Sequence, residues 1–215
     1  EMNDDDIEQV LESFADAAGR LAVAGFDLIE LQGAHGYLIN TFISPATNKR
    51  TDRYGGSHQN RMRFPLELVS RVRTRIGPNR LIGIRMNGHD LMPEGYGTED
   101  YCQVASEFED AGVDILHISA GTYRAMERRV TPMYLGEAPF LEYAADIKRR
   151  VGIPIIASGS IHSIETADAA IADGFADFVA MSRPIFADPD LPRKVITDRE
   201  EEIIPCIRCN TCVSR

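Results

Sequence analysis

The strongest constraint on the fold is a unit of an amphipathic stretch, a glycine and a short apolar run, which occurs five times along the chain. The apolar runs follow Gly25, Gly77, Gly112, Gly152 and Gly174. A glycine that ends a helix and leads into a β-branched run predicts a helix, a turn and a strand. Apolar residues also recur at helical spacing over residues 7–21 and 65–76, so each of these helices is expected to bury one face.

These units predict how the strands are arranged. Strands that are apolar at nearly every position are buried on both faces, and strands that alternate with helices run parallel. The fold class is therefore α/β, as a (β/α)8 TIM barrel or an open doubly wound sheet. No Gly-x-Gly-x-x-Gly follows any strand, which favours the barrel. Five strands are found where a barrel has eight, so the chain is expected to cover about the last five strand–helix units.

Composition excludes several other classes. The 215 residues are 44% hydrophobic and 26% charged, which suits a globular core and excludes disordered and collagen-like chains. The longest uncharged run, residues 31–48, contains many polar residues, and the acidic start is no signal peptide, so a cytoplasmic protein is expected. The net charge of −10 argues against nucleic-acid and membrane partners. The basic residues within 48–85 are expected to form a solvated helix face, with attraction of a phosphorylated ligand as the alternative.

Polar side chains follow the first two strands at their carboxyl ends, where barrels and doubly wound sheets carry their function. Gln32, His35 and Tyr37 place an amide, an imidazole and a phenol on one loop, and these can converge on a single ligand oxygen. The alternative is that they only pack the loop. Arg85 ends the second strand and should meet an anion, which is either a ligand or a structural ion-pair partner.

The last two strands lead into loops that can form a phosphate site. Ser158, Gly159 and Ser160 follow one strand, and Ser182 and Arg183 follow the other. Barrels commonly bind phosphate here through loop amides and a helix N-terminus. Gly159 would let the backbone approach closely, and Arg183 would supply charge. The alternative is that serines here cap helices without any ligand, as Ser163 is expected to do for the helix that follows it.

The cysteines are too few for a disulfide scaffold. Cys206, Cys209 and Cys212 lie within seven residues, which is typical of ligands to an iron–sulfur cluster or zinc. Either would need a fourth ligand, which we expect beyond Arg215. Cys102 lies alone on a helical segment and is expected to be a small buried apolar residue.

Residues 33–64, from Gly33-Ala-His35-Gly-Tyr37 to Asn60-Arg-Met-Arg-Phe64, closely resemble the signature of the Old Yellow Enzyme superfamily of FMN oxidoreductases. The resemblance continues through Arg85, the serine loop at 158–160 and residues 182–189 to the cysteines, so it covers nearly the whole chain. The cysteine run is similar to the iron–sulfur branch that includes 2,4-dienoyl-CoA reductase and trimethylamine dehydrogenase.

This resemblance implies a cofactor and a division of the chain. Residues 1–200 would be the C-terminal part of an FMN-binding (β/α)8 barrel, and residues 201–215 the start of an iron–sulfur segment. Arg85 would approach the N1 and O2 edge of the flavin. The remaining contacts to FMN, mostly at its phosphate, would come from Ser158, Gly159, Ser160, Ser182 and Arg183. A 4Fe-4S cluster would be bound by Cys206, Cys209 and Cys212.

The resemblance also implies a reaction. NADH or NADPH reduces FMN, and flavin N5 then delivers hydride to the β-carbon of an activated C=C bond in an enoate, enone or enoyl thioester. His35 and Gln32 would polarise the carbonyl group, and Tyr37 would protonate the α-carbon. The cluster would pass electrons onward. Expected partners are a small-molecule substrate, a second copy in a homo-oligomer, the missing part of the barrel, and a C-terminal nucleotide-binding module that would hold FAD.

Three other functions stay open. The first is an amine or N-methyl dehydrogenase of the trimethylamine dehydrogenase type, which is weakened because such an enzyme would be expected to have Tyr at position 32, where this chain has Gln. The second is an inactive barrel fragment that cannot close its flavin site. The third is a zinc-bearing barrel that binds a phosphorylated metabolite.

Overall fold

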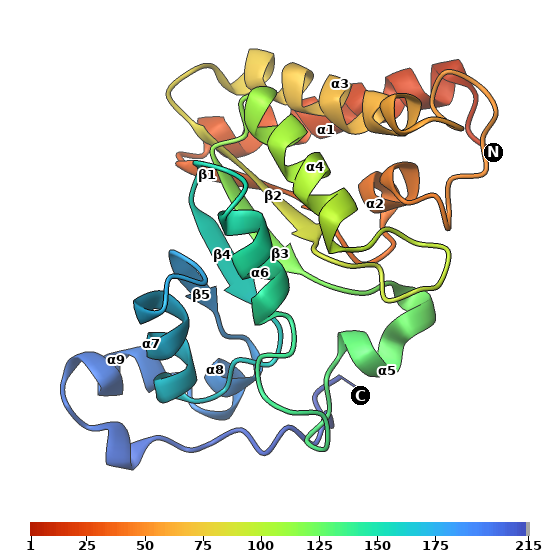
Figure 1. Cartoon of the computed structure of the whole chain (residues 1–215). Helices are drawn as coiled ribbons and strands as arrows, with labels where there is room; N and C mark the ends of the chain where they lie inside the picture. Colours follow the sequence, from red (N-terminus) through yellow and green to blue (C-terminus); the bar gives the residue numbers. More distant parts are fainter. Residues whose placement is uncertain (214–215) are drawn as a thin grey trace.

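In the computed structural model, which describes residues 1–213, five strands form one parallel sheet (Figure 1). The strands are β1 Leu28–Gly33, β2 Leu81–Asn87, β3 Ile115–Ser119, β4 Ile155–Ser158 and β5 Phe178–Ala180. Their hydrogen-bonded order is the chain order, β1-β2-β3-β4-β5. A doubly wound sheet reverses its strand order at a switch point, whereas a barrel does not. The predicted α/β class and the five consecutive units of a (β/α)8 barrel are therefore confirmed.

Helices connect the strands and cover one face of the sheet (Figure 1). The longer helices are α1 Asp4–Val23, α3 His58–Ile76, α4 Thr98–Asp110, α6 Leu141–Lys148 and α7 Ile164–Ala172. The shorter ones are α2 Leu38–Ile43, η1 Tyr123–Ala125, α5 Met126–Arg129, α8 Arg183–Ala187, α9 Leu191–Ile196 and η2 Glu200–Glu202. Gly77 ends α3 with φ 78°, and Gly112 follows α4 with φ 88°, a backbone region that favours glycine. This preference explains why glycines in the sequence indicated where the predicted helices end.

The alternation of side chains along each strand separates the core from the functional face. Ile84 and Leu116 point toward the helices and are fully buried in the core. The opposite face carries polar residues near the strand ends, because the register aligns Gln32 with Arg85 and Arg85 with His117. Backbone pairing alone thus gathers an amide, a guanidinium and an imidazole in one row.

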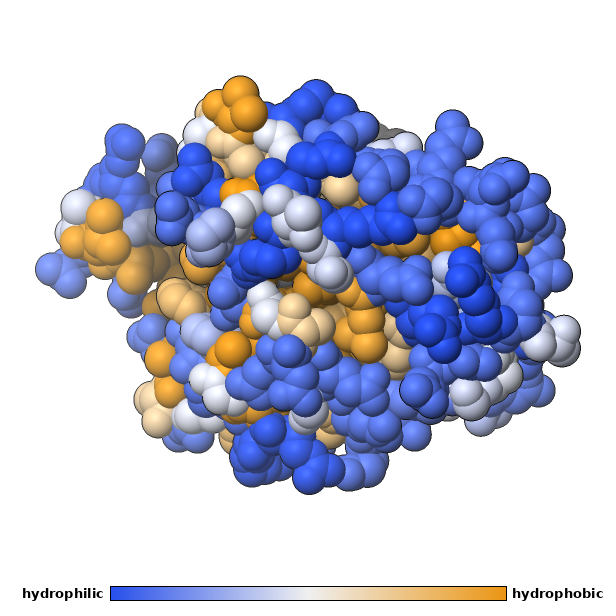
Figure 2. All heavy atoms as spheres, turned by 90° about the horizontal axis from the view of Figure 1, so that it is seen from above, coloured by the Kyte–Doolittle hydropathy of each residue, from blue (hydrophilic) through white to orange (hydrophobic). Residues whose placement is uncertain are grey.

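The uneven charge distribution is explained by contacts between α1 and α3. Arg71 lies 2.6 Å from both Glu8 and Glu12, and Arg75 pairs with Glu12 and with Asp16. We predicted a solvated face for most of the basic segment; Arg71 and Arg75 of α3 are partly exposed and pair with acids of α1. Viewed from the α1–α3 side, the surface is mostly hydrophilic (Figure 2). Exposed pairs of this kind stabilise a fold only weakly, so they account for charge placement more than for stability.

Cys102 in α4 is buried as predicted, and burial raises the pKa of its thiol. Over residues 1–213, no helix combines the length and the apolar character that crossing a membrane requires.

Candidate active site

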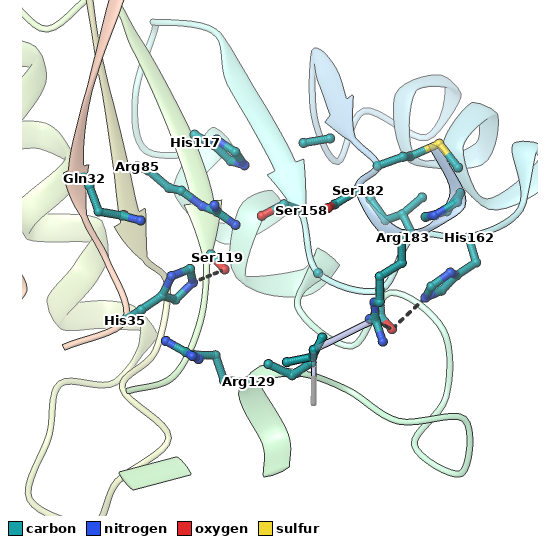
Figure 3. Close-up of a pocket in the computed structure, with 18 of the residues that line it drawn as sticks. Gln32, His35, Arg85, His117, Ser119, Arg129, Ser158, His162, Ser182 and Arg183 are labelled. Carbon is teal, nitrogen blue, oxygen red and sulfur yellow. Dashed lines mark hydrogen bonds between the residues drawn. The ribbon is translucent and has the colours of Figure 1, made fainter. Parts of the chain in front are cut away.

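A cavity of about 500 Å³ lies at the carboxyl ends of the strands (Figure 3). Every strand contributes to its lining: Gln32, His35 and Tyr37 from β1 and its loop, Arg85 from β2, His117 and Ser119 from β3, Ser158, Gly159 and Ser160 from β4 and its loop, and Ser182 and Arg183 after β5. All nine sequence-predicted residues other than the cysteines are therefore brought together around one space.

The His35 loop directs an imidazole into this cavity. His35 has φ 66°, a left-handed conformation that is uncommon for a residue with a side chain. Its Nε2 lies 2.7 Å from Ser119 Oγ. Burial, and then the positive charges of Arg85 and Arg129, lower the pKa of His35 to about 3. The imidazole is consequently neutral at pH 7, so it can donate a hydrogen bond to a ligand without carrying a charge.

Buried amides hold the backbone of this loop. The His35 N–H donates to Asn87 Oδ1 at 3.1 Å, and the Gly36 N–H donates to Asn40 Oδ1 at 2.7 Å. Both asparagines are fully buried. Gly36 is itself left-handed, with φ 79°. Two consecutive left-handed residues, of which only His35 is strained, are thus fixed by two side-chain acceptors from different elements.

Asp90, which is fully buried, orients Asn87 directly and Asn40 through the Tyr101 hydroxyl, to which Asn40 Nδ2 donates at 2.8 Å. One carboxylate oxygen accepts from Asn87 Nδ2 at 3.0 Å and from the Tyr101 hydroxyl at 2.7 Å. The other accepts from the Ser44 hydroxyl at 2.6 Å and from the Tyr96 N–H at 2.9 Å. Four donors therefore satisfy this charge, as a buried carboxylate requires.

Arg85 faces the cavity without an anionic partner. None of the ion pairs within residues 1–213 includes it, and its buried Nε has no hydrogen-bond partner. Burial lowers the pKa of Arg85, while the charge of Glu30 opposes that change. Glu30 pairs instead with His117, whose Nδ1 lies 2.9 Å from Glu30 Oε2. Of the two alternatives for Arg85, the structural ion pair is not found, and the guanidinium is left for a ligand.

The opposite side of the cavity carries Arg183. Its guanidinium donates to Thr131 O and to Ser160 Oγ, both at 2.9 Å. The Ser158 hydroxyl donates to a backbone carbonyl at 2.8 Å, so both loop serines are already engaged inside the protein. Gly159 has φ 112°, and a Cβ there would lie 2.3 Å from the ring of Phe140. Only glycine fits this turn.

The N-terminus of the neighbouring helix α7 is not free for an anion. Ser163 caps α7 by accepting from the Thr166 N–H, as the sequence alternative predicted. Glu137 accepts from the N–H groups of His162 and Ser163 at 2.6 and 2.7 Å. An anionic ligand is consequently left with the Gly159 loop and Arg183, because α7 already carries a carboxylate from its own chain.

The cysteine segment lies against the rim of the cavity. Asn210 donates to Val130 O at 2.9 Å and accepts from Arg183. Cys206 is half-buried, and Cys209 and Cys212 are exposed. Within residues 1–213, no three His, Cys, Asp or Glu side chains form a group that could hold a metal. Residues 214–215 of the predicted 201–215 segment lie outside the described residues.

Several residues of this cavity were not predicted from the sequence. His117 and Ser119 occupy alternate positions of an apolar strand, and a polar residue at every second position is a usable signal for a cavity-facing edge. Arg129 ends the four-residue helix α5 and His162 lies in a loop, and neither segment is long enough or regular enough for spacing to carry such a signal. The cavity thus contains three arginines and three histidines, and no Asp or Glu lines it within the described part of the chain.

Consecutive parallel βα units with a polar cavity at the strand carboxyl ends define the class of (β/α)8-barrel enzymes. The chain belongs to the NADH:flavin oxidoreductase / NADH oxidase family, whose sequence profile matches residues 1–202. The predicted resemblance to the Old Yellow Enzyme superfamily is confirmed by this match.

Similarity to individual proteins supports this family membership. An NADH oxidase from Thermoanaerobacter brockii is 43% identical over 210 residues, which are 98% of this chain and 32% of that protein. The structure of 2-naphthoyl-CoA reductase with 2-naphthoyl-CoA matches with a TM-score of 0.92 and 32% identity, over 98% of this chain and 32% of that one. Histamine dehydrogenase from Rhizobium sp. 4-9 matches with a TM-score of 0.89 and 32% identity, over 99% and 31%. The chain therefore spans about a third of the length of these relatives.

Proposed function

We propose that this chain forms the C-terminal part of the barrel in an FMN-dependent oxidoreductase that uses NADH or NADPH to reduce an activated C=C bond. The observation that carries the proposal is Arg85, a half-buried guanidinium with a buried, unpartnered Nε in the same cavity as Arg183, His35 and Tyr37. A partly desolvated cation without an anion is costly, so the cavity suits an anionic ligand.

The donor groups of the cavity fit FMN. Arg85 would hold the pyrimidine edge of the flavin, and Arg183 with the Gly159 loop would hold the phosphate. Ser158, Ser160 and Ser182 would shape this end, with the side chains of Ser158 and Ser160 bound internally and supporting the loop and Arg183. When bound, FMN would supply hydride transfer between the nicotinamide donor and the alkene.

The remaining polar groups fit a carbonyl-bearing substrate. Gln32 and neutral His35 would donate hydrogen bonds to the carbonyl oxygen, which orients the substrate and withdraws electrons from its C=C bond. Tyr37 would donate its phenolic proton to the α-carbon. The hydroxyl of Tyr37 accepts a hydrogen bond from the Tyr123 hydroxyl at 2.6 Å, so its own proton is directed elsewhere and can be given to a substrate.

Cys206, Cys209 and Cys212 stay proposed ligands of a 4Fe-4S cluster. Three thiols within seven residues have the donor chemistry for it, but their described positions do not gather them into a metal-binding group. Iron and acid-labile sulfide in equal amounts in the full-length protein would support this assignment, whereas zinc without iron would contradict it.

The full-length protein that contains this chain tests the main proposal. We expect it to carry FMN, to be bleached by NADH or NADPH without oxygen, and to be reoxidised by an enoate, an enone or an enoyl thioester. A flavin-loaded protein that none of these acceptors reoxidises would contradict the proposal. A full-length protein that binds no flavin would favour the inactive fragment.

An amine or N-methyl dehydrogenase is the second candidate, supported by the similarity to histamine dehydrogenase. The cavity weighs against it, because its three arginines repel an ammonium group and no carboxylate among residues 1–213 lines it to offset them. Bleaching of the flavin by a secondary or tertiary amine without any nicotinamide nucleotide would decide for this candidate.

Replacing Arg183 with Ala is expected to weaken FMN binding about 10- to 100-fold, since it removes a charge-assisted contact to the phosphate. The measurement is titration of the deflavinated full-length protein with FMN, followed by flavin fluorescence. Arg193→Ala is the matched control, because Arg193 is exposed on α9 outside the cavity. If both variants bound FMN with equal affinity, the proposal that Arg183 binds the FMN phosphate would be wrong.

A further inference from the structure

Arg129, the last residue of α5, is a third cation in the cavity to which no anion has been assigned. Its guanidinium lies 4.8 Å from the centre of the Tyr123 ring, and one of its nitrogens donates to Met126 Sδ at 2.9 Å. No described residue forms an ion pair with it. Stacking on an aromatic ring holds a guanidinium in place and leaves its N–H edge free for a planar anion.

The position of Arg129 makes its unpaired charge costly. Its charge lowers the pKa of Arg85 and also that of His35, which is neutral at pH 7, so Arg129 and Arg85 repel each other across the cavity. In the view of Figure 3, Arg129 lies on the His35 side of the cavity, away from Arg183. Arg73, by contrast, is paired with Asp114 at 2.5 Å. An anion beside His35 would relieve this repulsion.

FMN does not account for this third cation. The proposed contacts use Arg85 at the pyrimidine edge and Arg183 at the phosphate, whereas Arg129 lies by the side chains proposed to bind substrate. Tyr123, on which Arg129 stacks, also donates its hydroxyl hydrogen to Tyr37. The guanidinium and the proposed proton donor are therefore parts of one connected group.

We propose that Arg129 binds the carboxylate of the substrate, which makes the substrate class an α,β-unsaturated carboxylate rather than a neutral enone or thioester. This inference rests on the proposed function. A carboxylate withdraws electrons poorly, and hydride addition at the β-carbon places a second negative charge on it. A fixed cation stabilises that charge, whereas the neutral His35 supplies only a hydrogen bond.

When bound, FMN would supply the hydride, two electrons and one hydrogen that originate from the nicotinamide donor, for the new C–H bond at the β-carbon. The C=C π bond breaks, and its electron pair takes the phenolic proton of Tyr37 at the α-carbon. Tyr37 regains a proton from solvent, and the product is the saturated carboxylate, still paired with Arg129.

The test compares an acid with its neutral ester in the flavin-loaded full-length protein. Arg129→Met is expected to lower kcat/KM for cinnamate about 10- to 100-fold, as loss of a charged hydrogen-bonded contact does, and to change kcat/KM for methyl cinnamate little. Arg129→Lys should restore part of the loss. Arg124→Met is the matched control, since Arg124 is exposed on η1 and does not line the cavity.

A second readout needs no turnover. Calorimetric binding of 3-phenylpropanoate, the saturated acid, should weaken by a similar factor in Arg129→Met and stay unchanged in Arg124→Met. Equal losses for acid and ester would overturn the carboxylate assignment. A rise confined to the KM for NADH or NADPH would also overturn it and would assign Arg129 to a nucleotide phosphate. Continued reduction of the ester by Arg129→Met would show that the proposed function itself stands.

Discussion

Replacing Tyr37 with Phe is expected to slow reduction of the alkene by about 10²- to 10⁴-fold, the contribution typical of a positioned general acid. Flavin reduction by the nicotinamide nucleotide should stay nearly unchanged, because that half-reaction needs no proton at the α-carbon. The geometry supports this split, since the Tyr37 hydroxyl accepts from Tyr123 and keeps its own proton available. Stopped-flow absorbance of the flavin in the full-length protein measures the two half-reactions separately.

The control for this variant is Tyr134→Phe, because Tyr134 is exposed and lies outside the cavity. Tyr123→Phe adds a discriminating result: it removes the hydrogen bond to Tyr37 but keeps the proton donor, so its effect should be smaller. If Tyr37→Phe damaged both half-reactions equally, Tyr37 would be a residue that shapes the cavity and not the acid.

Replacing Asp90 with Ala is expected to destabilise the fold by about 4 kcal/mol, because the loss leaves several buried donors without an acceptor, each costing about 1 to 3 kcal/mol. The four donors to Asp90 come from the α2 C-cap, β2, the loop after β2 and α4. Chemical denaturation followed by circular dichroism measures the change. Asp168→Asn on the exposed face of α7 is the control and should stay within about 0.5 kcal/mol of the parent.

Asp90→Asn keeps the shape of the side chain and therefore separates packing from hydrogen-bond direction. Its NH2 group must face either the fixed Tyr96 N–H or the amide of Asn87. In the second case Asn87 has to turn over, and it would then present a donor to the His35 N–H. We expect a smaller loss of stability than with Ala, together with a changed imidazole resonance of His35 by NMR. An unchanged imidazole resonance would show that Asp90 does not influence the conformation of the His35 loop.

The elements of the fold that were predicted best are those whose sequence pattern has a direct geometric cause. All five strands and the helices over residues 7–21 and 65–76 were found, because glycine ends a helix in the left-handed region and buried faces repeat at helical spacing. The short helices α2, α5, α8 and α9 were not predicted. They have only four to six residues, which is too few for a period to appear.

The site was predicted to the extent that it follows strand ends. Gln32, Arg85, Gly159 and Arg183 all line the cavity because parallel strands end on the same edge of the sheet. Arg129 was missed because the helix that brings it there, α5, has only four residues. Asp90 was missed because its partners lie as far apart in the chain as Ser44 and Tyr101.

The order of residues along the chain determined the parallel strands, the edge on which they end and the residue types gathered at that edge. Each depends on a repeat that is local in the chain. Which of those side chains keep an internal partner was decided only by the tertiary structure. Glu30 pairs with His117 and Glu137 caps α7, whereas Arg85 and Arg129 meet no carboxylate within residues 1–213. Pairing of charges depends on distances between segments that only the folded chain defines, so the free cations that point to an anionic ligand are visible only there.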